Sequence, residues 1–163
     1  MSGALVYWKT AHILSAAVLF GTGAGIAFFC WFGYRHAVRS GDIGALRSTL
    51  RLTVVADACL TAPAVLFQAV SGIALMILLG WPLMSPWAVT VWSLFAFTGA
   101  CWLPVVWIQI AQMREANRVM STTELSDGFH SRFKLWFALG IAAFSAVVVI
   151  YFLMVAKPIR IAV

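Results

Sequence analysis

Four long apolar runs, each long enough to cross a bilayer as a helix, constrain what this chain can fold into. A transmembrane helix needs about 20 predominantly apolar residues. Only 10% of the 163 residues are charged and the mean hydropathy is +0.98, whereas a soluble domain has about 25% charged residues. We therefore predict an all-α integral membrane four-helix bundle, a single domain with helices at about 4–36, 45–79, 88–119 and 127–157.

Turn-forming residues separate these runs. Gly41 breaks the first helix from the second, since glycine adopts backbone conformations that end a helix. Pro82 and Pro86 stop the second helix and permit the third to begin. We expect the segment 121–124 to form a loop with a serine or threonine capping the last helix, which Pro158 then ends.

Lysine and arginine flank the runs unevenly. Eight lie beside the two longer polar loops and three lie beside the termini. The eight are Arg35, Arg39, Arg47, Arg51, Arg114, Arg118, Arg132 and Lys134, and the three are Lys9, Lys157 and Arg160. Because basic residues concentrate in cytoplasmic loops, we expect both termini on the non-cytoplasmic face of a bacterial inner (plasma) membrane.

The net charge of +6 does not indicate a nucleic-acid partner. Nucleic-acid binding needs basic residues gathered on one polar face or in one run, and here they lie between apolar spans. Contact with anionic lipid explains them. Cys30, Cys59 and Cys101 fall inside apolar stretches without C-x-x-C spacing, so we expect small packing residues rather than a zinc site or a disulfide.

Polar side chains recur along the second run. Asp57, Thr61, Gln68 and Ser71, the polar stripe, are separated by four, seven and three residues, which at 100° per residue keeps them within a narrow sector. Such groups face protein or water rather than lipid. They either line a transport path or hold helices together, for about 1 kcal/mol each. We expect Asp57 to pair with Arg51, another basic side chain or a backbone donor.

His12 is the one strongly polar residue within the first apolar run, and Lys9 lies one turn closer to its start. The small residues Ser15, Ala16 and Gly23 continue the face of His12 and would leave room for a flat cofactor. Imidazole can ligate haem iron, and Lys9 could neutralise the propionates. We therefore expect either a haem b site, with His12 as metal ligand and Lys9 as a second cofactor-binding residue, or a histidine hydrogen-bonded to a neighbouring helix.

The first helix also resembles known membrane proteins. Residues 8–14, with the sequence WKTAHIL, and residues 20–23, FGTG, resemble the W-x-K-x-x-H-I start of the HemJ-like protoporphyrinogen oxidases. More loosely, they are similar to the first helix of CopD-type copper-resistance proteins. The HemJ-like resemblance implies a haem-binding membrane oxidoreductase with His12 at the ligand position.

Across nearly its whole length, the chain resembles a bacterial family of predicted integral membrane proteins of unknown function. The similarity lies in the segments 56–57, 61–63, 102–107 (WLPVVW) and 154–158 (MVAKP). This resemblance implies a multi-pass membrane protein and brings no assigned activity.

Three functions from different classes follow. The first is a b-type haem redox protein that uses His12 to pass electrons between a lipophilic donor and an acceptor. The second is a small transporter or channel, expected to be a homo-oligomer, in which the polar stripe lines a path. The third is a structural or assembly subunit of a larger membrane complex. No Walker loop, nucleophile–base pair or H-E-x-x-H motif in the sequence favours a soluble-type enzyme.

Overall fold

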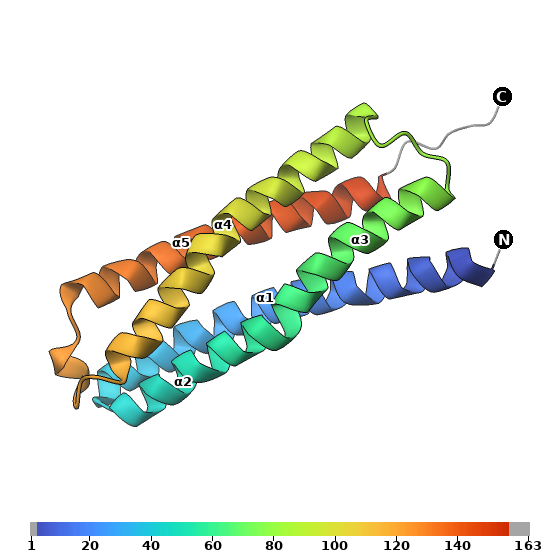
Figure 1. Ribbon diagram of the computed structural model, residues 1–163. Coiled ribbons are helices and arrows are strands. Elements are labelled where there is room, and N and C mark those ends of the chain that lie inside the picture. The colour runs from blue at the N-terminus through green and yellow to red at the C-terminus, as the bar shows by residue number, and fades with distance from the viewer. Residues whose placement is uncertain (1–2, 157–163) are drawn as a thin grey trace.

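The computed structural model describes residues 3–156, in which every long element is a helix (Figure 1). The elements are α1 (Gly3–Ser40), α2 (Ile43–Ala56), the π-helical turn η1 (Asp57–Thr61), α3 (Ala62–Leu78), α4 (Pro86–Ala116), the 3-10 turn η2 (Thr122–Glu124) and α5 (Asp127–Val155). Since α2, η1 and α3 run on without a break, the described chain has 4 helices long and apolar enough to cross a membrane. The predicted all-α four-helix fold is confirmed.

The turns form where the sequence predicts them. Gly41 has a φ of +71° and Gly80 a φ of +64°, a left-handed conformation that glycine adopts without steric cost. Asp42 then caps α2, since its Oδ1 accepts a hydrogen bond from the backbone N–H of Ala45 at 2.9 Å. The cap of α5 is Ser126, whose Oγ accepts from Phe129 N–H at 3.1 Å.

Helix α4 ends at Ala116, earlier than the expected boundary near residue 119. Arg47 of α2 donates from Nε to the carbonyl oxygen of Ala116 at 2.9 Å and from Nη2 to that of Val119 at 2.5 Å. These bonds satisfy carbonyl groups that a helix end leaves without partners, so the chain can turn there. Pro158, expected to end the last helix, lies outside the described residues.

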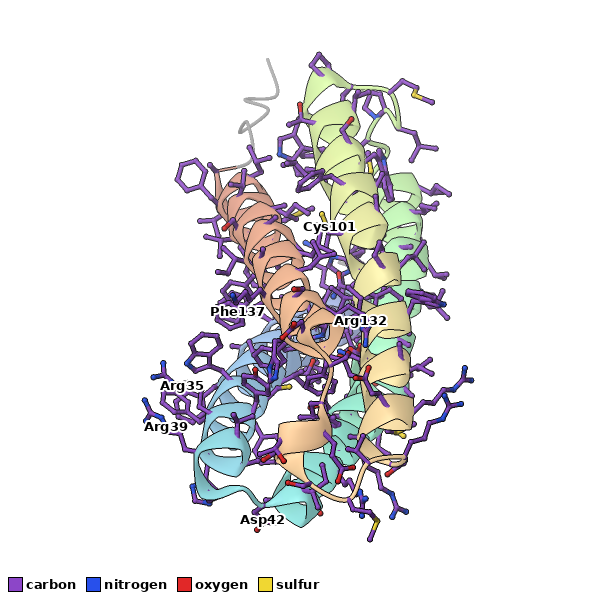
Figure 2. All side chains as sticks on the ribbon, turned by 90° about the vertical axis from the view of Figure 1, so that its left-hand side faces the viewer. Arg35, Arg39, Asp42, Cys101, Arg132 and Phe137 are labelled. Carbon is purple, nitrogen blue, oxygen red and sulfur yellow. The ribbon has the colours of Figure 1, made fainter. Side chains whose placement is uncertain are left out.

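The helices run up and down, so the start of α1 and the end of α5 lie at the same end of the bundle (Figure 1). The opposite end carries the α1–α2 turn, the α4–α5 connection and the eight basic residues; we call it the basic end. Arg35 and Arg39 project outward from α1 there (Figure 2). Helix α4 packs along α5, and α1 packs along α2 and α3.

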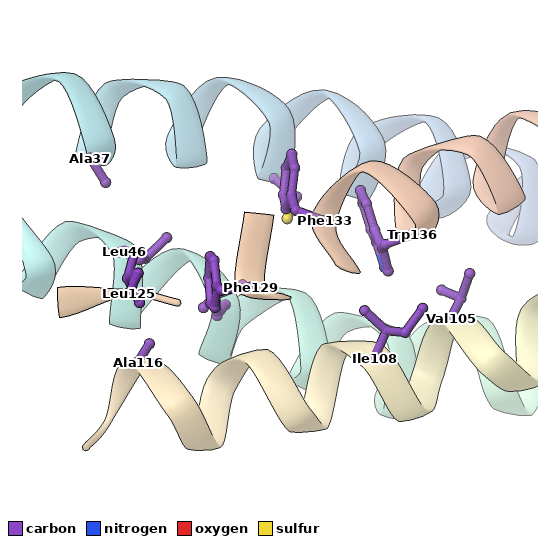
Figure 3. Packing of buried hydrophobic residues seen from close by; sticks show 11 residues of the cluster. Ala37, Leu46, Val105, Ile108, Ala116, Leu125, Phe129, Phe133 and Trp136 are labelled. Carbon is purple, nitrogen blue, oxygen red and sulfur yellow. The ribbon is translucent and has the colours of Figure 1, made fainter. Parts of the chain in front are cut away.

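The apolar core lies toward the basic end. Phe129, Phe133 and Trp136 of α5 fill the space between α1, α2 and α4 (Figure 3). Buried residues that pack with them include Cys30, Ala37, Leu46, Leu50, Val105, Ile108, Ala116 and Leu125. The three cysteines are free thiols, two of them buried. Tight packing is therefore concentrated in one half of the bundle.

The second span widens into a π-helical turn at Asp57–Thr61. The N–H of Ala62 bonds to the carbonyl oxygen of Asp57, five residues earlier. Pro63 follows directly; proline lacks an N–H, and its ring would clash with the carbonyl four residues before it in a regular α-helix. The wider turn relieves this conflict without ending the helix, as π-bulges do, often at functional sites.

Candidate functional site

A cavity of about 320 Å³ lies in the middle of the bundle, bordered by all four spans. Pockets that hold small molecules are typically about 300–1,000 Å³ and mostly apolar, with a few placed polar groups. This cavity fits that description. Its aromatic lining comes from Phe20, Phe95, Trp102, Trp136, Phe137 and Phe144, and its polar lining includes Asp57, Thr61, Thr98 and Gln109.

Asp57 is the ionisable residue of the cavity wall, and it is only 6% exposed. Trp102 of α4 donates its indole N–H toward the carboxylate, with Nε1 at 3.3 Å from each of the two oxygens. Gln109, two turns further along α4, donates from its amide nitrogen to Oδ2 at 3.1 Å. Asp57 is therefore held by donors on a helix far from it in sequence.

A second indole extends this network of hydrogen bonds to α5. Trp136 donates from Nε1 to the amide oxygen of Gln109 at 3.1 Å. Since an indole nitrogen can only donate, it fixes which end of the amide faces α5, and the amide nitrogen then faces Asp57. The hydrogen bonds that link Trp136, Gln109 and Asp57 therefore extend across the bundle beside the cavity.

The expected partner of Asp57 was Arg51, another basic side chain or a backbone donor, and this expectation is wrong, because the carboxylate bonds to the side chains of Trp102 and Gln109. Six residues separate Asp57 from Arg51, which at 100° per residue places them about 120° apart around the helix, and Arg51 is exposed. Within residues 3–156 the only ion pair joins Arg132 to Glu115. The partners of Asp57 are thus neutral, and the carboxylate has no counter-charge from a described side chain.

The polar stripe faces protein, as its spacing predicts, but not in one sector. Asp57 and Thr61 line the cavity, whereas Ser71 is fully buried against α1 and Gln68 bonds to α1. The π-helical turn is the reason, because its extra residue rotates the two halves of the span by about 100° relative to each other. Asp57 consequently faces α4 while Ser71 faces α1.

His12 is bonded to this second half of the stripe. Its Nδ1 lies 2.7 Å from Oγ of Ser71. Ser71 donates its one hydroxyl hydrogen to the carbonyl oxygen of Phe67 at 2.6 Å, so Oγ accepts from Nδ1–H. In the neutral imidazole the lone pair is then on Nε2, the tautomer found in many histidines that bind metals.

Small residues on α1 were expected to leave space for a flat cofactor beside His12. Helix α3 fills part of that space. Gln68 donates to Ser15 Oγ at 2.6 Å and to the carbonyl oxygen of His12 at 2.7 Å, so α3 covers the Ser15 side. A Cβ on Gly72 would lie 3.6 Å from Cε1 of His12 and 3.9 Å from Trp92. The site therefore supplies an oriented imidazole against closely packed helices, apart from the central cavity.

Lys9 lies one turn nearer the N-terminus than His12, on the same helix, and is half-buried. Within the described residues no group of three or more His, Cys, Asp or Glu side chains could hold a metal ion. A metal at this site would thus rely on His12 and on ligands of another kind.

Comparison with known protein families finds one family that matches nearly the whole chain. Residues 6–158 match the family described as predicted integral membrane protein, DUF2269. The chain belongs to this family. No curated protein and no solved structure matches it. The whole-chain resemblance to membrane proteins of unknown function is confirmed, and DUF2269 membership establishes an integral membrane protein in contact with lipid.

Sequence reasoning missed three residues of the cavity in this DUF2269 protein: Trp102, Gln109 and Trp136. One signal was present, because Trp102 and Gln109 are seven residues apart and share a helix face, with an amide well inside an apolar span. Nothing in the sequence places Trp136 beside them, since it comes from another helix.

Proposed function

We propose that this membrane protein binds a small lipophilic cation in the central cavity, with Asp57 as the counter-charge, and acts as a transporter or carrier. The observation that carries the proposal is the buried carboxylate on the cavity wall whose bonded partners are all neutral. Carboxylates within membrane spans are costly and usually belong to a substrate or ion pathway. A cationic ligand would supply the missing charge.

The lining of the cavity supports a ligand that is both cationic and apolar. Trp102, Trp136 and Phe95 border the space, and aromatic rings attract cations by about 0.5–2 kcal/mol, most strongly where water is excluded. The remaining wall is largely aliphatic and aromatic and suits a hydrocarbon group. A strongly hydrated inorganic ion would find few oxygen ligands there, which favours an organic cation.

The test compares a cation with its uncharged carbon analogue. Benzyltrimethylammonium and 2,2-dimethylpropylbenzene (neopentylbenzene) have nearly the same shape and differ in charge. Calorimetry on detergent-purified protein should show that Asp57→Asn weakens benzyltrimethylammonium binding at least tenfold, about 1.4 kcal/mol, and leaves binding of the neutral analogue unchanged.

Asp127→Asn is the matched control, because Asp127 is exposed at the start of α5 and does not line the cavity. It should bind the cation as the wild type does. Equal affinity of the wild type and Asp57→Asn for the cation would overturn the proposal, as would equal affinity of the wild type for the cation and its neutral analogue.

A second candidate is a haem b redox protein with His12 as ligand and Lys9 beside the propionates. The hydrogen bond from Nδ1 to Ser71 favours it, since bonds of this kind fix the orientation of imidazoles that ligate metals. His12→Ala should abolish the Soret band of haem-supplemented protein, and Lys9→Ala should weaken haem binding. His36→Ala, an exposed histidine at the basic end, is the control. A colourless wild type supplied with haem excludes this function.

We also propose that the chain lies in a bacterial inner (plasma) membrane with both termini on the non-cytoplasmic face, and forms a homo-oligomer when it transports. The eight basic residues at one end support the orientation. A reporter fused after Val163 should be active outside the cytoplasm, and one inserted near Thr122 should be active inside it. The reverse result would invert the orientation.

A further inference from the structure

Helices α1 and α5 touch through aromatic side chains at two levels. Toward the termini, Phe20 and Phe144 have ring centroids 4.6 Å apart. Toward the basic end, Trp31 and Phe137 are also 4.6 Å apart. These two contacts act as spacers that set the separation of the helices above and below the middle of the cavity.

Between the two aromatic contacts, the facing residues are small. The α1 residues there include Gly23, Ala24 and Ala27, and the α5 residues include Gly140 and Ala143, all of which line the cavity. A Cβ added to Gly140 would have nothing within 4 Å. The wall between α1 and α5 is therefore thin at this level.

This wall is also open to the surroundings of the bundle. Ala24 and Ser145 line the cavity and are nevertheless exposed, and Ile141 is 56% exposed. On the opposite side, Val65 and Thr98 are at least half-buried. Because the level is that of the apolar spans, the opening faces hydrocarbon, not water; we call it the lateral opening.

We propose that the ligand is a cationic amphiphile with one hydrocarbon tail, which enters from the bilayer so that its head pairs with Asp57 and its tail leaves through the lateral opening. This inference rests on the proposed function, which supplies the charge. A cavity of about 320 Å³ is near the lower limit for small-molecule pockets, so a long tail does not fit inside. A tail that stays among lipid chains is as well solvated as in free lipid.

A series of alkyltrimethylammonium ions with butyl, octyl and dodecyl tails tests the proposal in protein reconstituted into lipid nanodiscs. Affinity is expressed per mole of ligand in the lipid phase, which removes the effect of partitioning. In the wild type the three affinities should agree within about threefold, about 0.65 kcal/mol, because the tail stays in lipid. In Ala24→Phe, which narrows the opening, the ratio of the butyl affinity to the dodecyl affinity should rise at least tenfold above that of the wild type.

Two further variants complete the design. Ile141→Trp narrows the opening from α5 and should act as Ala24→Phe does, which covers the case that one of them fails to fold. Gly21→Phe is the matched control on α1, because Gly21 is exposed, lies outside the cavity lining and has nothing within 4 Å of an added Cβ. It should leave all three affinities unchanged.

The outcomes separate this inference from the proposed function. Suppose that butyltrimethylammonium binds the wild type and that Asp57→Asn weakens this binding, but that dodecyltrimethylammonium does not bind. The cavity is then closed toward lipid, and only the lateral opening is refuted. The same holds if Ala24→Phe and Ile141→Trp weaken butyl and dodecyl equally or not at all. If no tail length shows binding that depends on Asp57, the proposed function fails and the inference fails with it.

Discussion

At the basic end, aromatic side chains of α5 fill the space between the helices, whereas in the middle of the bundle the same helix borders a cavity. Phe129 is 0% exposed and Phe133 is nearly so, while Phe137 and Phe144, further along α5, line open space. The packed half can hold the four helices in place. The hollow half is therefore free to keep a void and a buried carboxylate, both of which cost stability.

The two halves should differ most in the free energy of unfolding that is lost when one phenylalanine in each half is replaced by alanine. Phe129→Ala leaves a cavity in a filled core, and we expect it to lower the free energy of unfolding by about 3–5 kcal/mol. Phe95→Ala enlarges a space that already exists, so it should cost about 1 kcal/mol, since fewer contacts are lost. Unfolding in mixed micelles with increasing SDS measures both. Equal costs would show that the cavity is filled in solution.

A smaller difference in stability is expected when a glycine in each half is replaced by alanine, which adds one methyl group. A Cβ on Gly33 would lie 2.6 Å from Thr49 Oγ1, and that hydroxyl is itself bonded to the carbonyl oxygen of Ala45. Gly33→Ala should therefore cost about 1–3 kcal/mol by overpacking. Gly140→Ala meets nothing within 4 Å and should change stability by less than about 1 kcal/mol, toward stabilisation, because alanine favours helix. A neutral Gly33→Ala would contradict the tight contact of α1 and α2.

The smallest effect concerns the junction of α1 with α3 beyond the cavity. Ser71→Ala removes the acceptor of His12 Nδ1–H and should cost about 0.6 kcal/mol, the typical worth of a hydrogen bond between helices in a membrane. A double-mutant cycle with His12→Ala isolates the coupling. Additive effects of the two substitutions would mean that this bond does not join the helices, and the bonds from Gln68 to α1 would then hold the junction.

Some residues of the candidate site can be predicted from the sequence and others cannot. The polar stripe is visible in the sequence, and its orientation toward protein follows from the cost of placing polar groups in lipid. The split of the stripe does not follow, because it depends on the π-helical turn before Pro63, which a constant 100° per residue leaves out. The partners of Asp57 were missed for the same reason and because Arg51, although near in sequence, lies on another face.

The amino-acid sequence by itself determined the class of the protein, the number of spans, their turns and caps, and the burial of the polar stripe. These features depend on local properties: the length of apolar runs, the conformations of glycine and proline, and the transfer cost of polar groups. Only the tertiary structure decided that Trp102, Gln109 and Trp136 gather around Asp57, that His12 bonds to Ser71, and that α1 and α5 leave an opening. Those contacts join residues far apart in the chain, and they depend on how each helix is rotated about its axis, which packing of all four helices together sets.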